Sequence, residues 1–239
     1  MAFHIYESAD QMTDAMGAWI CDLIASRLSR NPRFSFVLSG GNTPKSLYQL
    51  LAGDTYKDKI PWERLDFFWG DERFVPFADE RNNARMAFEN LLNHVPVSSD
   101  RIYPMQTNIS PAESVNQYDR LLKEYFGSNH MKGFDLVLLG MGEDGHTLSL
   151  FPGTTVIHEN NAWVSEFYLA SQQMHRITLT KVLVNQSAFV AFMVDGNAKA
   201  HALREVLKGK FQPDLYPSQV IKPSGELHWF LDKAAASGL

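Results

Sequence analysis

The first third of the chain opens with apolar positions that recur at intervals of three and four residues. Such spacing is the period of one face of an α-helix. The residues concerned are Met12, Ala15, Met16, Trp19, Ile20, Leu23 and Ile24. Asn31-Pro32 is a turn signal that ends the segment. The pattern predicts a helix over residues 9–28 that packs through one apolar side.

Short apolar runs follow and alternate with further helical patterns. We interpret six runs as strands, at residues 34–38, 65–69, 134–139, 176–180, 188–194 and 227–231. Helical patterns recur near residues 81–92, 115–126 and 197–208, and Pro44 suits the first position of another helix. This alternation favours an α/β fold with a mostly parallel sheet and helices on both faces. Because no linker or repeat divides the chain, we expect a single domain over residues 1–239.

Ligands of such sheets bind outside the carboxyl ends of the strands. The loops of interest are therefore those after Leu38, Trp69, Leu139 and Val194.

Composition and charge narrow the functional classes. Apolar residues make up 45% and charged residues 21% of the 239, which argues against disorder and fibrous repeats. Cys21 stands alone, which excludes an intrachain disulfide and a metal site built from thiols. No signal-like start or long apolar run is present, so we expect a cytoplasmic protein without a membrane partner. The net charge of −5 argues against nucleic acid, and an anionic ligand would need a local cluster of cations and N–H groups.

The loop after Leu38 reads Ser39-Gly40-Gly41-Asn42-Thr43-Pro44. Adjacent glycines let the backbone approach a ligand closely, and a helix start presents unpaired N–H groups beside a positive dipole end. A phosphate fits such a place. The alternative is a tight turn in which Thr43 caps the helix.

The loop after Trp69 places three charges, Asp71, Glu72 and Arg73, directly after a buried strand. Arg73 is the natural clamp for an anion because a guanidinium binds phosphate through two parallel hydrogen bonds. The alternative is a solvated turn in which these charges pair with one another.

The loop after Leu139 is the most informative. Three glycines lie within six residues, and Asp144 and His146 follow two apart. A histidine at a strand end can act as general base, and a nearby carboxylate can fix its tautomer. The alternative is a histidine that packs or caps locally. The other seven histidines show no metal-ligand spacing and no Gly-x-Ser-x-Gly motif occurs, so we expect neither a metal site nor a serine hydrolase.

Taken together, these loops resemble the 6-phosphogluconolactonase family. The segments that carry the resemblance are 38–44, 69–76, 140–152, 176–180, 196–199 and 229–235. The stretch from Asp144 to Pro152 is the most specific of them. The family has the glucosamine-6-phosphate deaminase-like fold, a modified Rossmann arrangement. Three departures from the family's usual residues occur, at Asn42, at the 82–84 segment Asn-Asn-Ala and at Lys181-Val182. Asn is also a good turn and cap residue, so the first is harmless, whereas the other two leave details of the cleft wall open.

The resemblance implies hydrolysis of 6-phosphogluconolactone in the oxidative pentose phosphate pathway, without a cofactor. His146 would be the general base and Asp144 its support. The residues implied in substrate and phosphate binding are Ser39, Gly40, Gly41, Asn42, Thr43, Arg73, Arg176 and Lys199. The partner would be a phosphorylated sugar lactone, and we expect a monomer, with an oligomer left open.

Two other functions stay open at this point. The deaminase-isomerase branch of the same fold has a Glu, which assists sugar ring opening, where this chain has Phe151. Because Phe cannot accept a proton, the lactonase branch is favoured. A non-catalytic sugar-phosphate sensor would need the cations but not His146.

Overall fold

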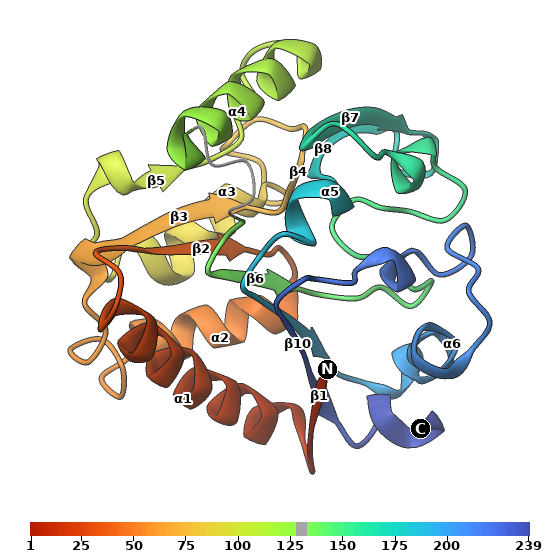
Figure 1. Cartoon of the computed structure of the whole chain (residues 1–239), viewed down its shortest axis with the longest axis horizontal. Coiled ribbons are helices and arrows are strands. Elements are labelled where there is room, and N and C mark those ends of the chain that lie inside the picture. Colours follow the sequence, from red (N-terminus) through yellow and green to blue (C-terminus); the bar gives the residue numbers. More distant parts are fainter. Residues whose placement is uncertain (128–132) are drawn as a thin grey trace.

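The structure is a computed structural model, and it describes residues 1–127 and 133–239 (Figure 1). Its main sheet has seven strands, and every pair of neighbouring strands runs parallel. The order across this sheet is β1 (Ala2–Tyr6), β10 (Glu226–Asp232), β9 (Phe189–Val194), β6 (Leu136–Leu139), β2 (Phe34–Leu38), β3 (Leu65–Trp69) and β5 (Ile102–Tyr103). The predicted parallel α/β fold is therefore confirmed.

A second, smaller sheet contains β4 (Asp71–Arg73), β8 (Met174–Leu179) and β7 (Val164–Leu169), all antiparallel. The strand predicted at 176–180 belongs to this sheet and not to the parallel one. The physical reason is the connection, since only residues 170–173 join β7 to β8, and a parallel pair needs a crossover of a dozen or more residues. The sequence pattern did not predict β1, β4, β5 or β7.

The described part of the chain contains six α-helices, some of which begin at a side-chain cap. They are α1 (Ala9–Leu28), α2 (Asn42–Ala52), α3 (Asn83–Ala87), α4 (Pro111–Phe126), α5 (Lys181–Val184) and α6 (Ala200–Lys208). Ser8 caps α1 by accepting from the Gln11 N–H, and Ser110 and Glu113 cap α4 reciprocally. The predicted 81–92 helix is split, because a π-helical turn over Phe88–Leu92 follows α3. No helix of the described residues is long and apolar enough to cross a membrane.

Successive strand residues pack into opposite layers, which explains why the strands are apolar throughout. In β2, Phe36 joins the cluster beneath α1 and α2, whereas Val37 joins the cluster beneath α4, α6 and the small sheet. Figure 1 shows these two layers on either side of the parallel sheet. A strand that is buried on both faces cannot alternate between apolar and polar residues.

The strand order reverses between β2 and β6, and this places the site. From β2 the chain adds β3 and β5 on one side, and from β6 it adds β9 and β10 on the other. The loops that leave the carboxyl ends of β2 and β6 therefore diverge and leave a crevice between them. These are the two glycine-rich loops singled out in the sequence.

Candidate active site

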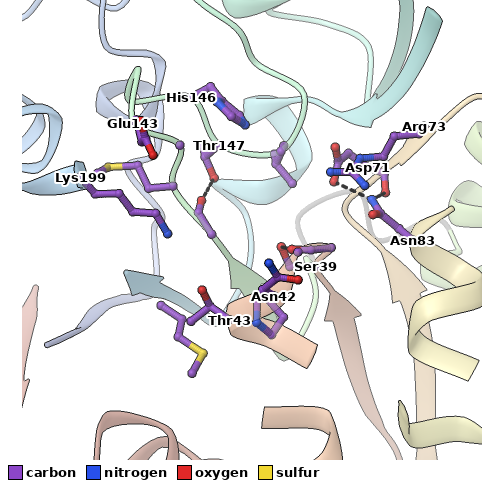
Figure 2. A pocket seen from close by; sticks show the side chains of 18 of the residues that line it. Ser39, Asn42, Thr43, Asp71, Arg73, Asn83, Glu143, His146, Thr147 and Lys199 are labelled. Carbon is purple, nitrogen blue, oxygen red and sulfur yellow. Dashed lines mark hydrogen bonds between the residues drawn. The ribbon is translucent and has the colours of Figure 1, made fainter. Parts of the chain in front are cut away.

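A pocket of about 310 Å³ lies at this crevice (Figure 2). Figure 2 shows His146 facing Ser39 and Asn42, with Lys199 on one side and Arg73 on the other. All predicted site residues except Asp144 line the pocket. The remaining lining residues are Pro44, Asp71, Asn83, Gly140, Met141, Gly142, Glu143, Thr147, Leu148 and Met193. Loops that lie far apart in the sequence thus form one site.

The turn between β2 and α2 presents backbone donors to the pocket. Gly41 has φ +102°, a conformation that favours glycine, and no side chain caps the helix start. Within the part of the chain that the structure describes, no hydrogen bond engages the N–H groups of Gly41, Asn42 or Thr43. The Thr43 hydroxyl donates to Asp195 at 2.5 Å, so the alternative in which Thr43 caps the helix is wrong.

Gly40 is required for a different reason. A Cβ at this position would lie 2.0 Å from the side-chain oxygen of Asn83. The Asn83 amide therefore packs directly against the turn, and its Nδ2 donates to the Asp71 carbonyl at 2.9 Å. Asn83 lies in one of the segments that departs from the family pattern, and it forms part of the pocket wall.

His146 and Asp144 form a hydrogen-bonded pair. The His146 Nδ1 lies 2.6 Å from an Asp144 carboxylate oxygen, which also accepts from the His146 backbone N–H at 3.1 Å. Partial burial alone would raise the pKa of Asp144, but the hydrogen bonds and charge of His146 outweigh it, and the pKa is lowered. Because an ionised carboxylate can only accept, Nδ1 carries the ring proton and Nε2 is left as the base.

The glycines of this loop leave space for the imidazole. A Cβ on Gly142 would lie 2.1 Å from the His146 Nδ1, and Gly145 has φ +75°. The Gly142 N–H donates to the His146 carbonyl and the Gly145 N–H donates to the Gly142 carbonyl. These two amides hold the loop itself, so they are not donors for a reaction intermediate.

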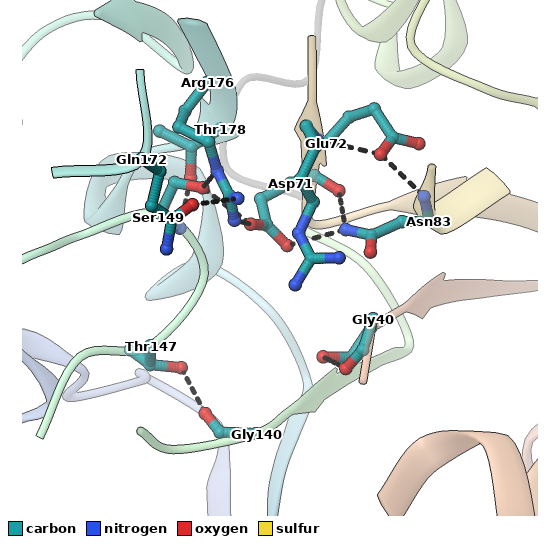
Figure 3. Close-up of polar contacts among 12 residues, drawn as sticks. Gly40, Asp71, Glu72, Asn83, Gly140, Thr147, Ser149, Gln172, Arg176 and Thr178 are labelled. Carbon is teal, nitrogen blue, oxygen red and sulfur yellow. Dashed lines mark hydrogen bonds and ion pairs between the residues drawn. The ribbon is translucent and has the colours of Figure 1, made fainter. Parts of the chain in front are cut away.

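The three cations of the pocket differ in their partners. Arg176 is 3% exposed, and its guanidinium donates to Asp71, Ser149 and Gln172 (Figure 3). Burial lowers the pKa of Arg176, and Asp71 opposes this effect. Arg73 donates to the Arg81 carbonyl, but its buried Nε has no partner within residues 1–127 and 133–239. The Lys199 Nζ lies 3.4 Å from Asp195.

Asp71 and Glu72, to which sequence reasoning assigned no separate role in the site, are buried beside the pocket. Asp71 accepts from Arg176 and Ser149, and Glu72 accepts three backbone N–H groups, those of Arg73, Asn83 and Ala84. Burial raises the pKa of Glu72 to about 7 against these hydrogen bonds. The charges after β3 therefore do not pair with one another. The alternative of a solvated turn, in which they would pair, is wrong. Only the folded chain shows this, because Arg176 and Ser149 lie far from Asp71 in sequence.

Comparison with known proteins identifies the family of this chain. The family model described as glucosamine-6-phosphate isomerases/6-phosphogluconolactonase matches residues 7–229. The chain belongs to this family. A Synechocystis protein named 6-phosphogluconolactonase is 37% identical over 219 residues, which cover 90% of this chain and 89% of that protein. A Haemophilus influenzae protein of the same name is 35% identical, with 83% and 84% covered.

Solved structures of the family have the same fold. A 6-phosphogluconolactonase from Trypanosoma brucei superposes with a TM-score of 0.87 at 26% identity, covering 100% of this chain and 98% of that one. A monomeric glucosamine-6-phosphate deaminase superposes with a TM-score of 0.85 at 18% identity and supports the fold alone. The predicted deaminase-like fold is thus confirmed.

Proposed function

We propose that this chain is a carboxylic ester hydrolase that converts 6-phosphogluconolactone to 6-phosphogluconate. The observation that carries the proposal is the arrangement of one pocket. His146, which is hydrogen-bonded to Asp144, lines the pocket, and Arg73, Arg176 and Lys199 line the same space with the glycine-rich turn. The membership of the family and the names of its relatives support the same reaction.

His146 acts as the general base. Its Nε2 takes a proton from a water molecule while the water oxygen bonds to the lactone carbonyl carbon, which gives a tetrahedral oxyanion. The bond from that carbon to the ring oxygen then breaks, and the imidazolium returns the proton to the departing oxygen. Such proton transfer contributes roughly 10²–10⁴-fold to a rate. Asp144 holds the productive tautomer and stabilises the imidazolium.

The substrate phosphate binds to the cations and to the glycine-rich turn. Arg73 lines the pocket and offers its guanidinium group, and the free N–H groups of the turn offer further donors. Ser39, Gly40, Asn42 and Thr43 form the floor beneath the phosphate. Anchoring the phosphate also positions the carbonyl at the far end of the substrate, so binding energy away from the bond that breaks assists the reaction.

The deaminase reaction is disfavoured by the group beside the base. Phe151 packs against the His146 ring at a centroid distance of 4.1 Å, where a second proton-transfer group would be needed.

A single-domain organisation, a monomeric state and a cytoplasmic location stay predictions.

His146→Ala tests the function. The variant should lose nearly all enzyme-dependent hydrolysis, measured by acid release with the spontaneous rate subtracted, while product binding is kept. His94→Ala, which changes an exposed histidine outside the pocket, is the matched control and should retain full activity. A folded His146→Ala enzyme with normal activity would exclude the base. Ammonia release from glucosamine 6-phosphate by the unmodified enzyme would instead support the deaminase.

A further inference from the structure

Phe151 is a pocket neighbour to which the proposed reaction gives no role. Its side chain is 8% exposed and its ring stacks on the His146 imidazole, with centroids 4.1 Å apart and planes 25° apart. It lies five residues after the base in the same loop. The buried aromatic ring therefore contacts the His146 imidazole, whose orientation the proposed mechanism requires to be fixed.

The other contacts of the imidazole leave its plane underdetermined. Asp144 holds only the Nδ1 edge, and the Asp144 side chain is 49% exposed. Exposed ion pairs hold their side chains weakly because water competes for both partners. Gly142 lies close to the imidazole, near Nδ1 and Cε1. The Phe151 ring stacks on a face of the imidazole.

The charge that develops in the reaction also favours an aromatic neighbour. His146 becomes an imidazolium when it takes a proton from water, and the face of an aromatic ring attracts a cation. The Arg176 guanidinium carbon lies 5.5 Å from the centroid of the same ring. Phe151 thus contacts both the buried cation and the base. An aliphatic side chain of similar size would fill the space without the ring face.

We propose that Phe151 is a positioning residue for the His146 base. It holds the plane of the imidazole so that Nε2 faces the pocket, and it stabilises the imidazolium formed during proton transfer. The inference deepens the role given to His146 in the proposed function and rests on it.

Phe151→Leu is the variant that tests this role. We expect kcat for 6-phosphogluconolactone to fall about ten-fold, with KM within about two-fold, because the base loses its orientation while phosphate binding is kept. The acid limb of the kcat profile should move to lower pH, since the imidazolium loses a stabilising neighbour. Phe151→Tyr keeps the ring and should retain most of kcat. Phe151→Met is a second non-aromatic variant that covers the case in which the Leu variant fails to fold.

Phe192→Leu is the matched control. Phe192 is a core residue that stacks on Trp229 with ring centroids 3.9 Å apart, and it does not line the pocket. This variant should lose stability but keep kcat per folded molecule and an unchanged acid limb. A Phe151→Leu enzyme that behaves in the same way would overturn the positioning role.

A proton NMR titration of His146 separates this inference from the proposed function. In the unmodified protein the imidazole protons should show a ring-current shift that Phe151→Leu abolishes, and the titration midpoint should fall in the variant. This measurement needs no substrate. If the unmodified enzyme fails to hydrolyse the lactone, the proposed function is wrong, whereas an unchanged His146 resonance in the variant overturns the inference about Phe151.

Discussion

Arg73 and Arg176 face each other as register partners on β4 and β8, yet their guanidinium groups have opposite surroundings. Arg176 is buried and forms an ion pair with Asp71 at 2.9 Å, which Ser149 extends. Arg73 forms no ion pair within the described residues, and one of its buried N–H groups has no acceptor. Both line the same pocket.

The difference separates a residue that builds the wall from one that is available to a ligand. Removing one partner of a buried ion pair strongly destabilises the folded protein, because the other charge stays buried without a partner. The guanidinium of Arg73 has no carboxylate partner among the described residues, so its charge is available to an anion that enters the pocket. Arg176 is therefore chiefly a structural cation whose remaining N–H groups can face the phosphate, and Arg73 is chiefly a binding cation.

The largest expected effect comes from breaking the Arg176–Asp71 pair. Arg176→Met leaves the Asp71 carboxylate buried without its cation and should lower the free energy of unfolding by about 3–5 kcal/mol. Chemical denaturation at constant pH measures it.

The double variant Arg176→Met/Asp71→Asn checks the cause. It removes the buried charge as well and should recover part of the lost stability, because the two residues are coupled. The single variant Asp71→Asn completes the comparison. If the losses of unfolding free energy in Arg176→Met and Asp71→Asn simply add in the double variant, the ion pair does not stabilise this wall.

The sequence predicted the elements whose pattern is local and missed those that depend on pairing. The 9–28 helix and the strands at 34–38 and 65–69 coincide with α1, β2 and β3. Strands β4 and β5 are only three and two residues long, too short for a periodic pattern. They exist because neighbouring strands supply their hydrogen bonds, which no local signal records.

The candidate site shows the same division. The glycine-rich loops and His146 could be predicted because a strand end, glycines and a base lie together in sequence. The partner of Arg176 could not, since Asp71 lies 105 residues away. Glu72 likewise acts on the start of α3, and a charged residue after a strand does not reveal that role.

The second expected effect concerns Glu72, which anchors the backbone of Arg73. Its pKa is raised from 4.5 to about 7 by burial, so the folded protein binds a proton that the unfolded chain releases between these values. The contribution to stability is present below about pH 4.5 and is lost as the pH rises through 7. We expect a loss of about 3 kcal/mol across this window.

Glu72→Gln is the control, because its neutral side chain cannot titrate. Unfolding free energies of both proteins should be measured from pH 4.5 to 7.5. The difference between them should change steadily through the window, with the unmodified protein losing stability relative to the variant. Parallel curves would contradict the raised pKa of Glu72.

The third effect is on binding rather than on stability. Arg73→Ala should lower kcat/KM for the phosphorylated lactone by about ten- to hundred-fold, because a charge-assisted hydrogen bond contributes roughly 1.5–3 kcal/mol. An unphosphorylated gluconolactone never forms this bond and should lose little.

A stability measurement and a control variant show whether the loss in Arg73→Ala comes from phosphate binding. The unfolding free energy should stay close to that of the unmodified protein, in contrast to Arg176→Met. Arg30→Ala removes the same charge from an exposed site outside the pocket and should change neither substrate. Equal losses with both lactones would mean that Arg73 acts on the fold or on the chemistry.

The smallest effect is expected at Lys199. Like Arg176 it has an acidic neighbour, but its side chain is partly exposed. Its ammonium is a point charge without the two-pronged geometry of a guanidinium, and Asp195 at 3.4 Å already offsets part of its charge. Lys199→Ala should therefore reduce kcat/KM for the phosphorylated lactone by several-fold, less than Arg73→Ala, and leave the unphosphorylated lactone unchanged. Raising the salt concentration should reduce this difference, because the Lys199 side chain is 22% exposed and its field is screened. Lys208→Ala, at the exposed end of α6, supplies the matched control and should have no effect on either substrate. A loss at Lys199 that exceeds the loss at Arg73 would reverse the comparison and make the lysine the principal phosphate ligand.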